Sequence, residues 1–299
     1  MLETAYSFLE YRRSQELERR KHACEALPGL LTIEVNITEL CNRKCVFCPR
    51  VDPEKYPNHN IMIPKQVVDR LVSEVKRLGY HSKISFSGFG EPTLNPTFLE
   101  IIRKFRAASD DLVIETNTNG DKLSSEDLDD LYDAGLSSFY WNLYDGPEQL
   151  EKVEKIIAAS KFPAEKIRIR PHWEGCDLEK EAGLILNNRS GALSPLDTAL
   201  HQSCNYPFYK MFVDWNGNVL SCSNDWFRKY VVGNIMYVPL DKIWMDPKWH
   251  QFRMNLYEGN RSMNSPCNTC DVEGTLFGND SVATYLKRWY DESSISNSR

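Results

Sequence analysis

The sequence predicts an α/β fold: a partial (β/α)6 barrel with a small cysteine-bearing C-terminal domain. From about residue 30 to residue 190, short apolar segments alternate with amphipathic ones, as expected for parallel strands joined by helical crossovers. After about residue 195 this alternation ends. Six strand–helix units are too few for a closed eight-stranded barrel, so we expect an open one.

Short apolar runs mark the expected strands, which lie at Leu31–Ile37, Lys83–Phe89, Leu112–Thr118, Ser138–Leu143, Ile167–Pro171 and Leu184–Asn188. Two intervening segments have apolar residues at helical spacing, one at Val67, Val68, Leu71, Val72 and Val75, the other at Phe98, Ile101, Ile102 and Phe105. A third helix is expected to begin at Ser124, with Asp127 in the capping-box position, and to stop at Gly135. Each helix therefore has a defined face or end that fits a crossover between strands.

The C-terminal third has a different pattern. Phe208–Asp214 and Val219–Ser223 predict a hairpin, and Asn216-Gly217 between them favours a type I′ turn. We therefore expect four parts: a helical segment at 1–28, the barrel at 29–195, a cysteine-bearing domain at 196–275, and a helix and tail at 276–299.

Composition limits the possible functions. The chain has 299 residues, 41% of them apolar, nine cysteines and a formal net charge of −6. It contains no apolar run of the roughly 18 residues that a membrane span needs and no N-terminal signal core, so we expect a cytoplasmic protein that does not insert in a membrane. The negative charge argues against nucleic acid as a partner. In a reducing compartment, clustered cysteines are better explained as metal ligands or catalytic thiols than as disulfides.

Three cysteines form a compact group directly after the first expected strand. Cys41, Cys45 and Cys48 follow a Cys-x3-Cys-x2-Cys spacing in a loop at the carboxyl end of that strand, where α/β folds place their active sites. Three thiolates can hold an iron–sulfur cubane that keeps one iron open for a ligand. The alternative is a zinc site, which would need a fourth ligand such as His59.

This spacing, with Phe47 before the last cysteine, resembles the signature of the radical S-adenosylmethionine (SAM) superfamily. The resemblance implies a [4Fe–4S] cluster whose open iron binds the methionine part of SAM. Reductive cleavage of SAM then releases a 5′-deoxyadenosyl radical, which takes a hydrogen atom from the substrate.

The same resemblance implies further cofactor contacts at the ends of later strands. Gly90-Glu91 is similar to the glycine-rich segment that holds the methionine amino group. Asn142 occupies a position where many relatives carry serine, and Arg170 could bind a carboxylate or form a salt bridge at the barrel mouth. The expected SAM-binding residues are Phe47, Gly90, Glu91, Thr118, Asn119, Asn142 and Arg170.

A second cysteine set lies downstream. Cys204, Cys222, Cys267 and Cys270 could complete either a tetrahedral zinc site or a fully ligated four-iron cluster. The set resembles the auxiliary-cluster region of SPASM and twitch proteins, and the lack of a cysteine after Cys270 favours the twitch form with one auxiliary cluster. The spacing is especially similar to that of the twitch-containing aminocyclitol dehydrogenases of butirosin biosynthesis, radical enzymes that oxidise a secondary alcohol to a ketone.

Three other residues stand near these motifs or outside them. Cys24 lies in a helical pattern and is expected to be a buried structural residue. Cys176 and Arg189 follow strand ends and are the candidate catalytic residues, Cys176 as a hydrogen donor or acceptor and Arg189 as a substrate or carboxylate contact.

Together these observations predict a radical SAM oxidoreductase with two [4Fe–4S] clusters. We expect it to oxidise a hydroxylated small molecule such as a sugar or aminocyclitol, with the auxiliary cluster accepting the second electron and a flavodoxin- or ferredoxin-type protein donating the first. A second hypothesis is radical modification of a peptide, by crosslinking, epimerisation or decarboxylation. A third is a non-catalytic metal-binding or electron-transfer protein, which would need neither an open iron nor the Gly-Glu segment.

Overall fold

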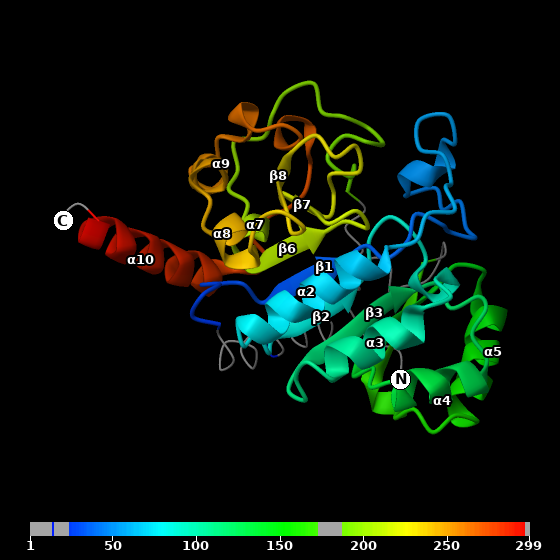
Figure 1. Cartoon of the computed structure of the whole chain (residues 1–299). Coiled ribbons are helices and arrows are strands. Elements are labelled where there is room, and N and C mark those ends of the chain that lie inside the picture. Colours follow the sequence, from blue (N-terminus) through cyan, green and yellow to red (C-terminus); the bar gives the residue numbers. More distant parts are fainter. Residues whose placement is uncertain (1–13, 15–23, 173–186, 297–299) are drawn as a thin grey trace.

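The computed structural model describes residues 14, 24–172 and 187–296. Its centre is an eight-stranded sheet of order β5-β4-β3-β2-β1-β6-β7-β8 (Figure 1). The strands are β1 (Thr32–Val35), β2 (Lys83–Phe86), β3 (Val113–Thr118), β4 (Ser138–Leu143), β5 (Ile167–Pro171), β6 (Lys210–Val213), β7 (Asn218–Leu220) and β8 (Val231–Asn234). The longer helices are α2 (Lys65–Arg77), α3 (Phe98–Arg106), α4 (Ser125–Asp133), α5 (Pro147–Ala158), α9 (Pro247–Tyr257) and α10 (Asn279–Ser296).

Six neighbouring strands are parallel, and β1 lies in their interior. β1 pairs with β2 on one side, with Thr32 opposite Lys83, and with β6 on the other, with Thr32 opposite Lys210. Parallel pairing brings the carboxyl ends of all six strands to one edge of the sheet. The loops that follow the strands therefore meet at that edge.

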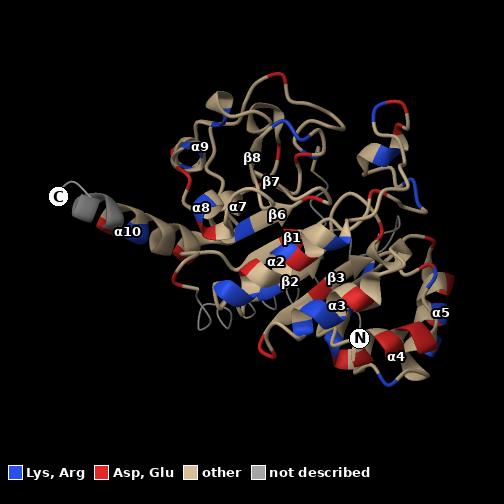
Figure 2. Cartoon of the chain, in the orientation of Figure 1, with Lys and Arg blue, Asp and Glu red and all other residues tan. Residues whose placement is uncertain are grey.

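The helices cover one face of the sheet. Ile33, Ile84 and Phe86 from the strands are buried in one core together with Leu71 of α2 and Ile102 of α3. Charged residues recur along α2, α3 and α4, as expected for amphipathic helices with one face in water (Figure 2). The predicted helical faces and the capping box of α4, with Ser124 and Asp127 bonded to each other's backbone, are confirmed.

A sixth parallel strand of the described sheet comes from the predicted hairpin. Asn187 and Asn188, the described end of the expected strand Leu184–Asn188, are not in a strand, and the rest of that segment lies outside the described residues. The sixth parallel strand is β6, the first strand of the predicted hairpin. Its inward Lys210 and its buried Met211 and Val213 alternate as in β1, which lets it extend the same sheet.

The hairpin of β6 and β7 is confirmed, but its predicted type I′ turn is wrong. A type I′ turn needs positive φ at both central residues, and here only Gly217 has one, at 84°. The Gly217 amide donates to Asp214 O at 2.9 Å, and the Asp214 amide donates to Asn218 O at 2.8 Å. The loop is thus one residue longer than predicted, with glycine in its left-handed position.

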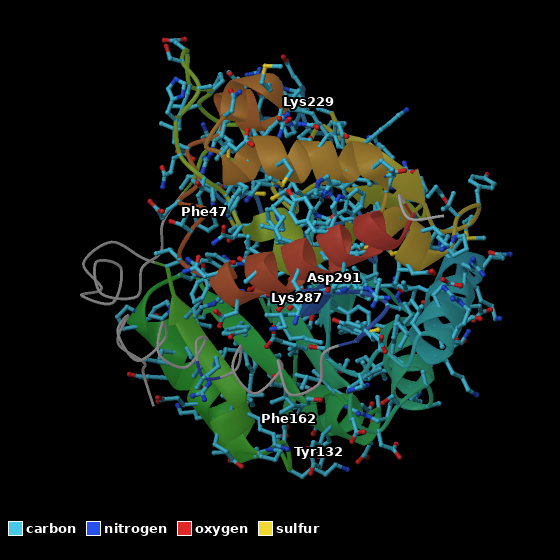
Figure 3. All side chains as sticks on the ribbon, turned by 90° about the vertical axis from the view of Figure 1, so that its left-hand side faces the viewer. Phe47, Tyr132, Phe162, Lys229, Lys287 and Asp291 are labelled. Carbon is cyan, nitrogen blue, oxygen red and sulfur yellow. The ribbon has the colours of Figure 1, made fainter. Side chains whose placement is uncertain are left out.

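The chain after β8 packs small helices around an enclosed arginine. Arg253 of α9 is fully buried, with its guanidinium 4.0 Å from the Trp244 ring centroid and 3.9 Å from that of Trp249. Tyr285 of α10 closes this cluster, and Lys287 and Asp291 mark the continuation of that helix in Figure 3. These cation–π contacts replace the water that the charge has lost. In the part of the chain that is described, no helix has the length and apolar character to span a membrane.

Candidate active site

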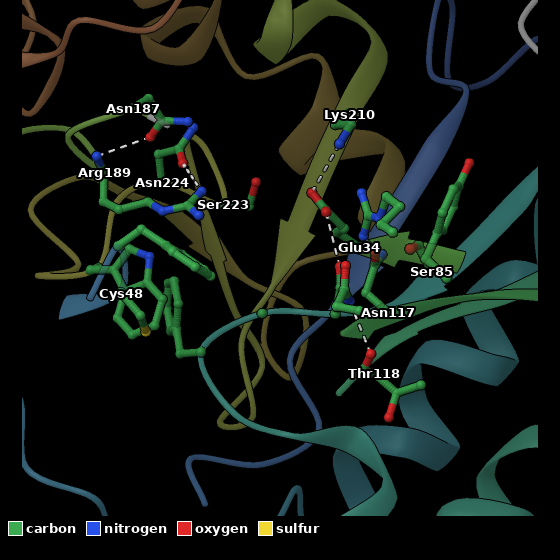
Figure 4. Close-up of a pocket in the computed structure, with 18 of the residues that line it drawn as sticks. Glu34, Cys48, Ser85, Asn117, Thr118, Asn187, Arg189, Lys210, Ser223 and Asn224 are labelled. Atoms are coloured by element: carbon green, nitrogen blue, oxygen red, sulfur yellow. Dashed lines mark hydrogen bonds and ion pairs between the residues drawn. The ribbon is translucent and has the colours of Figure 1, made fainter. Parts of the chain in front are cut away.

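A cavity of about 460 Å³ opens at the carboxyl ends of the parallel strands, within the size range of small-molecule sites. It extends from the three-cysteine loop to the inner face of the sheet (Figure 4). Among its lining residues are Cys41, Cys45, Cys48, Phe47, Gly90, Glu91, Thr118, Asn119, Asn142, Arg170 and Arg189. The structure thus brings together every sequence-predicted residue of the first site that it describes. Cys176 lies outside the described residues.

The first half of the three-cysteine loop is held by two sets of contacts. Asn58 accepts a bond from the Cys41 amide and donates one to Cys41 O, each at 2.9 Å. Arg43 bridges to Asp121 at 2.6 Å and to Asp145 at 2.5 Å, which ties the loop to the segments after β3 and β4. These contacts fix the backbone that presents the thiols before any metal binds.

Burial makes the three thiols poor anions on their own. It raises the pKa of Cys41 and Cys48 and lifts that of Cys45 to about 12, where the neighbouring thiols add to the effect. A bound iron would supply the positive charge that such thiols need in order to ionise. The desolvated three-thiol wall is therefore suited to metal ligation and would be unfavourable as a set of free thiolates.

Gly90 allows the strand β2 loop to touch the cysteine loop. A Cβ at this position would lie 2.3 Å from Thr38 O and 2.8 Å from Leu40 O, closer than any side chain can come. The next amide, that of Glu91, donates to Leu40 O at 2.8 Å. Glycine at position 90 is thus required for Glu91 to stand beside Cys41.

Glu91 is a buried carboxylate that joins two strand ends. Its Oε1 accepts bonds from Thr93 and from Thr118 Oγ1, the latter at 2.6 Å, and its Oε2 accepts one from the Asn119 amide at 2.8 Å. Asn119 in turn donates to Asn42 in the cysteine loop at 2.9 Å. Burial raises the pKa of Glu91 despite these donors. Because Oε2 has a single partner among the described residues, it can accept a further donor from a ligand.

Three rings form an aromatic stack at the cavity. The His172 ring centroid is 5.5 Å from that of Phe47 and 5.0 Å from that of Tyr144. Asn142 donates to Thr118 O, so its Oδ1 accepts from His172 Nε2 at 3.1 Å. In the neutral ring Nδ1 is then an acceptor, and this buried atom has no partner in the described chain. Burial, aided by Arg170 and Arg189, lowers the pKa of His172 to about 3.

The inner face of the sheet carries charges of both signs. Glu34 accepts from Ser87 at 2.9 Å and lies 3.4 Å from Lys210, and Lys83 pairs with Glu115 at 2.5 Å. Burial would raise the pKa of Glu34, but Lys210 and the hydroxyl donors outweigh it and keep the pKa below its ordinary value. An ionised carboxylate therefore stands in the floor of the cavity.

Arg170 also belongs to this inner face. It donates to Asn117 Oδ1 at 2.5 Å and stacks over Tyr140 at 4.4 Å from the ring centroid. Sequence reasoning selected Arg170 but missed Glu34, Lys210, Lys83 and Glu115. Their signal was present: polar residues recur at every second position within otherwise apolar strands, and such residues share one face.

Arg189 enters the cavity from the segment between barrel and hairpin. It stands in the left-handed region with φ of 50°, and its Nη1 donates to Asn224 at 3.4 Å (Figure 4). Its buried Nε has no partner among the described residues. The charge of Arg189 also favours the ionised form of the Cys48 thiol. The guanidinium thus faces the cavity beside the three-cysteine wall.

The four downstream cysteines surround a second, smaller cavity. Cys204, Cys222, Cys267 and Cys270 all line it, together with apolar side chains such as Phe252, Leu256 and Val272. Burial raises the pKa of Cys204 to about 11 and that of Cys267 well above its ordinary value. Asn224 and Val272 amides each point at a cysteine sulfur, at 3.4 Å, as around iron–sulfur clusters. Among the described residues, no three His, Cys, Asp or Glu side chains converge closely enough to hold a single metal ion.

The comparisons with known proteins agree with this geometry. The model of the radical SAM superfamily matches residues 35–184, half of the chain, and the chain therefore belongs to that superfamily. A model of an iron–sulfur cluster-binding domain, SPASM, matches residues 204–271, which contain all four downstream cysteines. Membership implies a [4Fe–4S] cluster and SAM, and the second domain implies auxiliary iron–sulfur chemistry.

Individual relatives differ in how much of this chain they match. The S-adenosyl-L-methionine-dependent 2-deoxy-scyllo-inosamine dehydrogenase of Niallia circulans is 29% identical over 249 residues, 80% of this chain and 92% of that enzyme. The probable GTP 3′,8-cyclase of Thermococcus kodakarensis is 33% identical over only 28% of this chain and 26% of its own.

Solved structures confirm the predicted fold class. BtrN in complex with AdoMet and 2-DOIA superimposes with a TM-score of 0.72 at 25% identity, over 84% of this chain and 96% of that one. The protein anSMEcpe with bound AdoMet, with a TM-score of 0.50 and 14% identity over 90% and 96% of the two chains, shares the fold alone.

Proposed function

We propose that this radical SAM enzyme oxidises a secondary alcohol of an amino-bearing, hydroxylated small molecule, with an aminocyclitol as the first candidate. The observation that carries the proposal is the single cavity of about 460 Å³ that joins the three thiols to a charged inner face. The similar enzyme from Niallia circulans is a dehydrogenase of 2-deoxy-scyllo-inosamine. When bound, the cofactors would supply a hydrogen-abstracting 5′-deoxyadenosyl radical and an acceptor for the second electron.

The ligand assignment follows the two cysteine sets. Cys41, Cys45 and Cys48 would hold the [4Fe–4S] cluster that binds SAM, with one iron left for the cofactor. Cys204, Cys222, Cys267 and Cys270 would hold a fully ligated auxiliary [4Fe–4S] cluster. In support, each set lines its own cavity.

The remaining first-site residues would bind SAM. Phe47, together with His172 and Tyr144, offers ring faces against which an adenine can stack, and the free acceptor of His172 suits an amino donor. Glu91 Oε2 suits the methionine ammonium group, which needs an acceptor. The other residues proposed to contact SAM are Gly90, Thr118, Asn119, Asn142 and Arg170.

Substrate would lie between this cofactor site and the sheet floor. The ionised Glu34 can bind an ammonium group, and Lys210 beside it can donate to hydroxyl oxygens. Arg189 would contact the substrate from the opposite side, since its guanidinium faces the same cavity and its Nε has no partner in the part of the chain that is described. A small cavity floor that carries both a negative and a positive side chain fits a small polyol better than an extended peptide.

The first electron would come from a flavodoxin- or ferredoxin-type protein. Val46, between two of the cysteines, is 80% exposed and marks the place where such a donor could approach the cysteine loop. With eight free cysteines in the described chain, we infer that the enzyme works in a reducing cytoplasm.

One experiment tests cofactors and substrate class together. Wild type and a Cys41→Ala/Cys45→Ala/Cys48→Ala variant are reconstituted anaerobically, reduced with dithionite, and given SAM and 2-deoxy-scyllo-inosamine deuterated on its ring carbons. We expect about eight irons per chain in wild type and about four in the variant. Only wild type should form deuterated 5′-deoxyadenosine and the ketone.

Cys24→Ala is the matched control, because Cys24 is a buried thiol outside both sets that donates to Leu78 O at 3.3 Å. It should match wild type in iron content and turnover. Zinc in place of iron would overturn the radical assignment. Deoxyadenosine without deuterium, in the presence of the inosamine, would overturn the aminocyclitol assignment.

A further inference from the structure

The segment that carries Arg189 is a left-handed turn pressed against the auxiliary cysteines. Arg189, Ser190 and Gly191 have φ of 50°, 53° and 83°. Left-handed backbone is costly for residues other than glycine, so a run of this kind persists only where its surroundings hold it. The structure shows what holds it.

Asn188 bonds the turn to the segment Cys267–Cys270, which we call the two-cysteine clip. Its buried side chain donates to Thr269 O at 2.7 Å and to Ser194 O at 2.8 Å, and its Oδ1 accepts from the Gly191 amide at 3.0 Å. Thr269 lies between Cys267 and Cys270. One amide group thus bonds Thr269 on one side and, on the other, Gly191 of the turn and Ser194 beyond it.

Two more contacts strengthen the junction. Asp271, directly after Cys270, accepts from the Asn188 amide at 2.8 Å, and Thr269 Oγ1 donates to Ser190 O at 3.2 Å. Gly191 has no room for a side chain, since a Cβ there would lie 2.4 Å from Thr269 Oγ1. The turn and the clip are therefore packed and bonded as one unit.

Asn224 makes a second connection from the other side. Its amide groups point at Cys222 Sγ, at 3.4 Å from the backbone nitrogen and 3.7 Å from Nδ2, and its Oδ1 accepts from Arg189 at 3.4 Å. The guanidinium of Arg189 is thus held at its tip by a partner of one auxiliary cysteine. The backbone beside it is held by Asn188, which bonds Thr269 and Asp271 next to two other auxiliary cysteines.

We propose that Asn188 is a positioning residue that couples the auxiliary cysteine site to the substrate cavity by holding Arg189 in place. The clip sets the position of Thr269 and Asp271, Asn188 transmits that position to the left-handed turn, and the turn aims the guanidinium of Arg189. Loss of the auxiliary group would then loosen the substrate site as well. The expected loss of substrate binding rests on the proposed function, whereas the expected loosening of the turn does not.

The test is Asn188→Asp in the enzyme loaded with both clusters. Aspartate has nearly the same volume, but it replaces the two donated bonds by contacts between oxygens. We expect backbone amide exchange across residues 189–196 to become about tenfold faster or more, while iron content and the auxiliary cluster's EPR spectrum stay as in wild type. The KM for the inosamine should rise, with SAM cleavage in the absence of substrate unchanged.

Gly191→Ala is the second variant, since its added methyl group pushes the turn from Thr269 while residue 188 stays asparagine, and it should speed exchange in the same residues. Asn264→Asp is the control: this buried amide in the same region donates to Phe252 O at 2.7 Å but does not contact the turn. It should leave exchange at 189–196 as in wild type.

A third variant tests whether loss of the auxiliary cysteines loosens the turn. Cys267→Ala/Cys270→Ala should raise exchange at 189–196 even though the turn itself is unaltered. Exchange that stays at the wild-type rate in Asn188→Asp would overturn the proposal. If the inosamine is not a substrate, the proposed function fails, and the exchange comparison still decides the role of Asn188.

Discussion

At the scale of single residues, His172 is held neutral by its surroundings. Burial, with the positive charges of Arg170 and Arg189, lowers its pKa to about 3, whereas an unfolded histidine titrates near its ordinary value of about 6.5. Between these two pKa values His172 is therefore protonated in the unfolded chain but not in the folded chain. Stability from this residue is complete above the unfolded pKa and is lost as the pH falls from there toward the folded value.

His172→Gln removes this dependence while keeping a group that can bond Asn142. We expect wild type, relative to the variant, to lose about 2 kcal/mol of unfolding free energy between pH 7 and pH 5. Urea unfolding of both proteins without SAM measures the difference, and loss of clusters in acid is common to both. A difference that is flat with pH would show that His172 titrates normally in the fold.

The gathering of the first-site residues at one cavity was largely predictable from local sequence. The cysteine spacing and the Gly90-Glu91 pair are contiguous motifs, so their roles do not depend on knowing which distant segments meet. Glu34 and Lys210 were missed because they lie 176 residues apart and form a pair only after β1 and β6 become neighbours. Their inward direction was visible in the strand alternation, but their partnership was not.

At the scale of elements, Arg228 joins the cysteine loop to the hairpin. It donates to Asp214 at 2.6 Å and to Tyr56 OH at 2.8 Å, and it also pairs with Glu39, two residues before Cys41. Asp214 and Glu39 are almost fully buried. Burial raises the pKa of Glu39 even with these arginine contacts. The network therefore joins the cysteine loop to the hairpin, and it does so by burying charged carboxylates, which is unfavourable without their arginine partner.

Arg228→Met should destabilise the fold by about 3 kcal/mol, because it leaves the Asp214 and Glu39 carboxylates buried with one cation fewer. Arg228→Met/Asp214→Asn should recover part of this loss. The control is Lys161→Met, which breaks a pair whose side chains are 49% and 58% exposed and should cost less than about 1 kcal/mol. Chemical unfolding compares the three, and equal small losses would mean that the network contributes little.

Element prediction missed the pairing of β6 with β1, because register and pairing depend on tertiary contact. The first five strands follow from their apolar runs, since each is flanked by a helix with one apolar face. The sixth parallel strand was assigned to Leu184–Asn188 because alternation of strands and helices favoured a strand before the hairpin. In the structure the hairpin strand Lys210–Val213 pairs in parallel with β1, a pairing that only tertiary contact decides, and residues 184–186 lie outside the described residues.

At the scale of the whole molecule, one continuous sheet supports both cysteine sites. β1 precedes Cys41 by a short loop, β6 is its parallel neighbour, and β7 leads directly to Cys222. The aromatic cluster of Phe89, Phe212 and Trp226 packs between these elements and against Cys48. The distance between the two sites is thus set by the sheet and by dry packing, which favours a rigid placement of the two cysteine sets relative to each other.

Removal of the auxiliary site should separate hydrogen abstraction from net oxidation. In Cys267→Ala/Cys270→Ala the three-cysteine wall is intact, so SAM cleavage and deuterium transfer from the labelled inosamine should continue. The second electron would lose its nearby acceptor, and we expect the ketone formed per 5′-deoxyadenosine to fall about tenfold or more. Mass spectrometry of both products from one anaerobic reaction gives this ratio, with Cys24→Ala as the control for a lost thiol. A ratio equal to that of wild type would mean that the auxiliary site supports the fold and the Arg189 turn but takes no part in the oxidation.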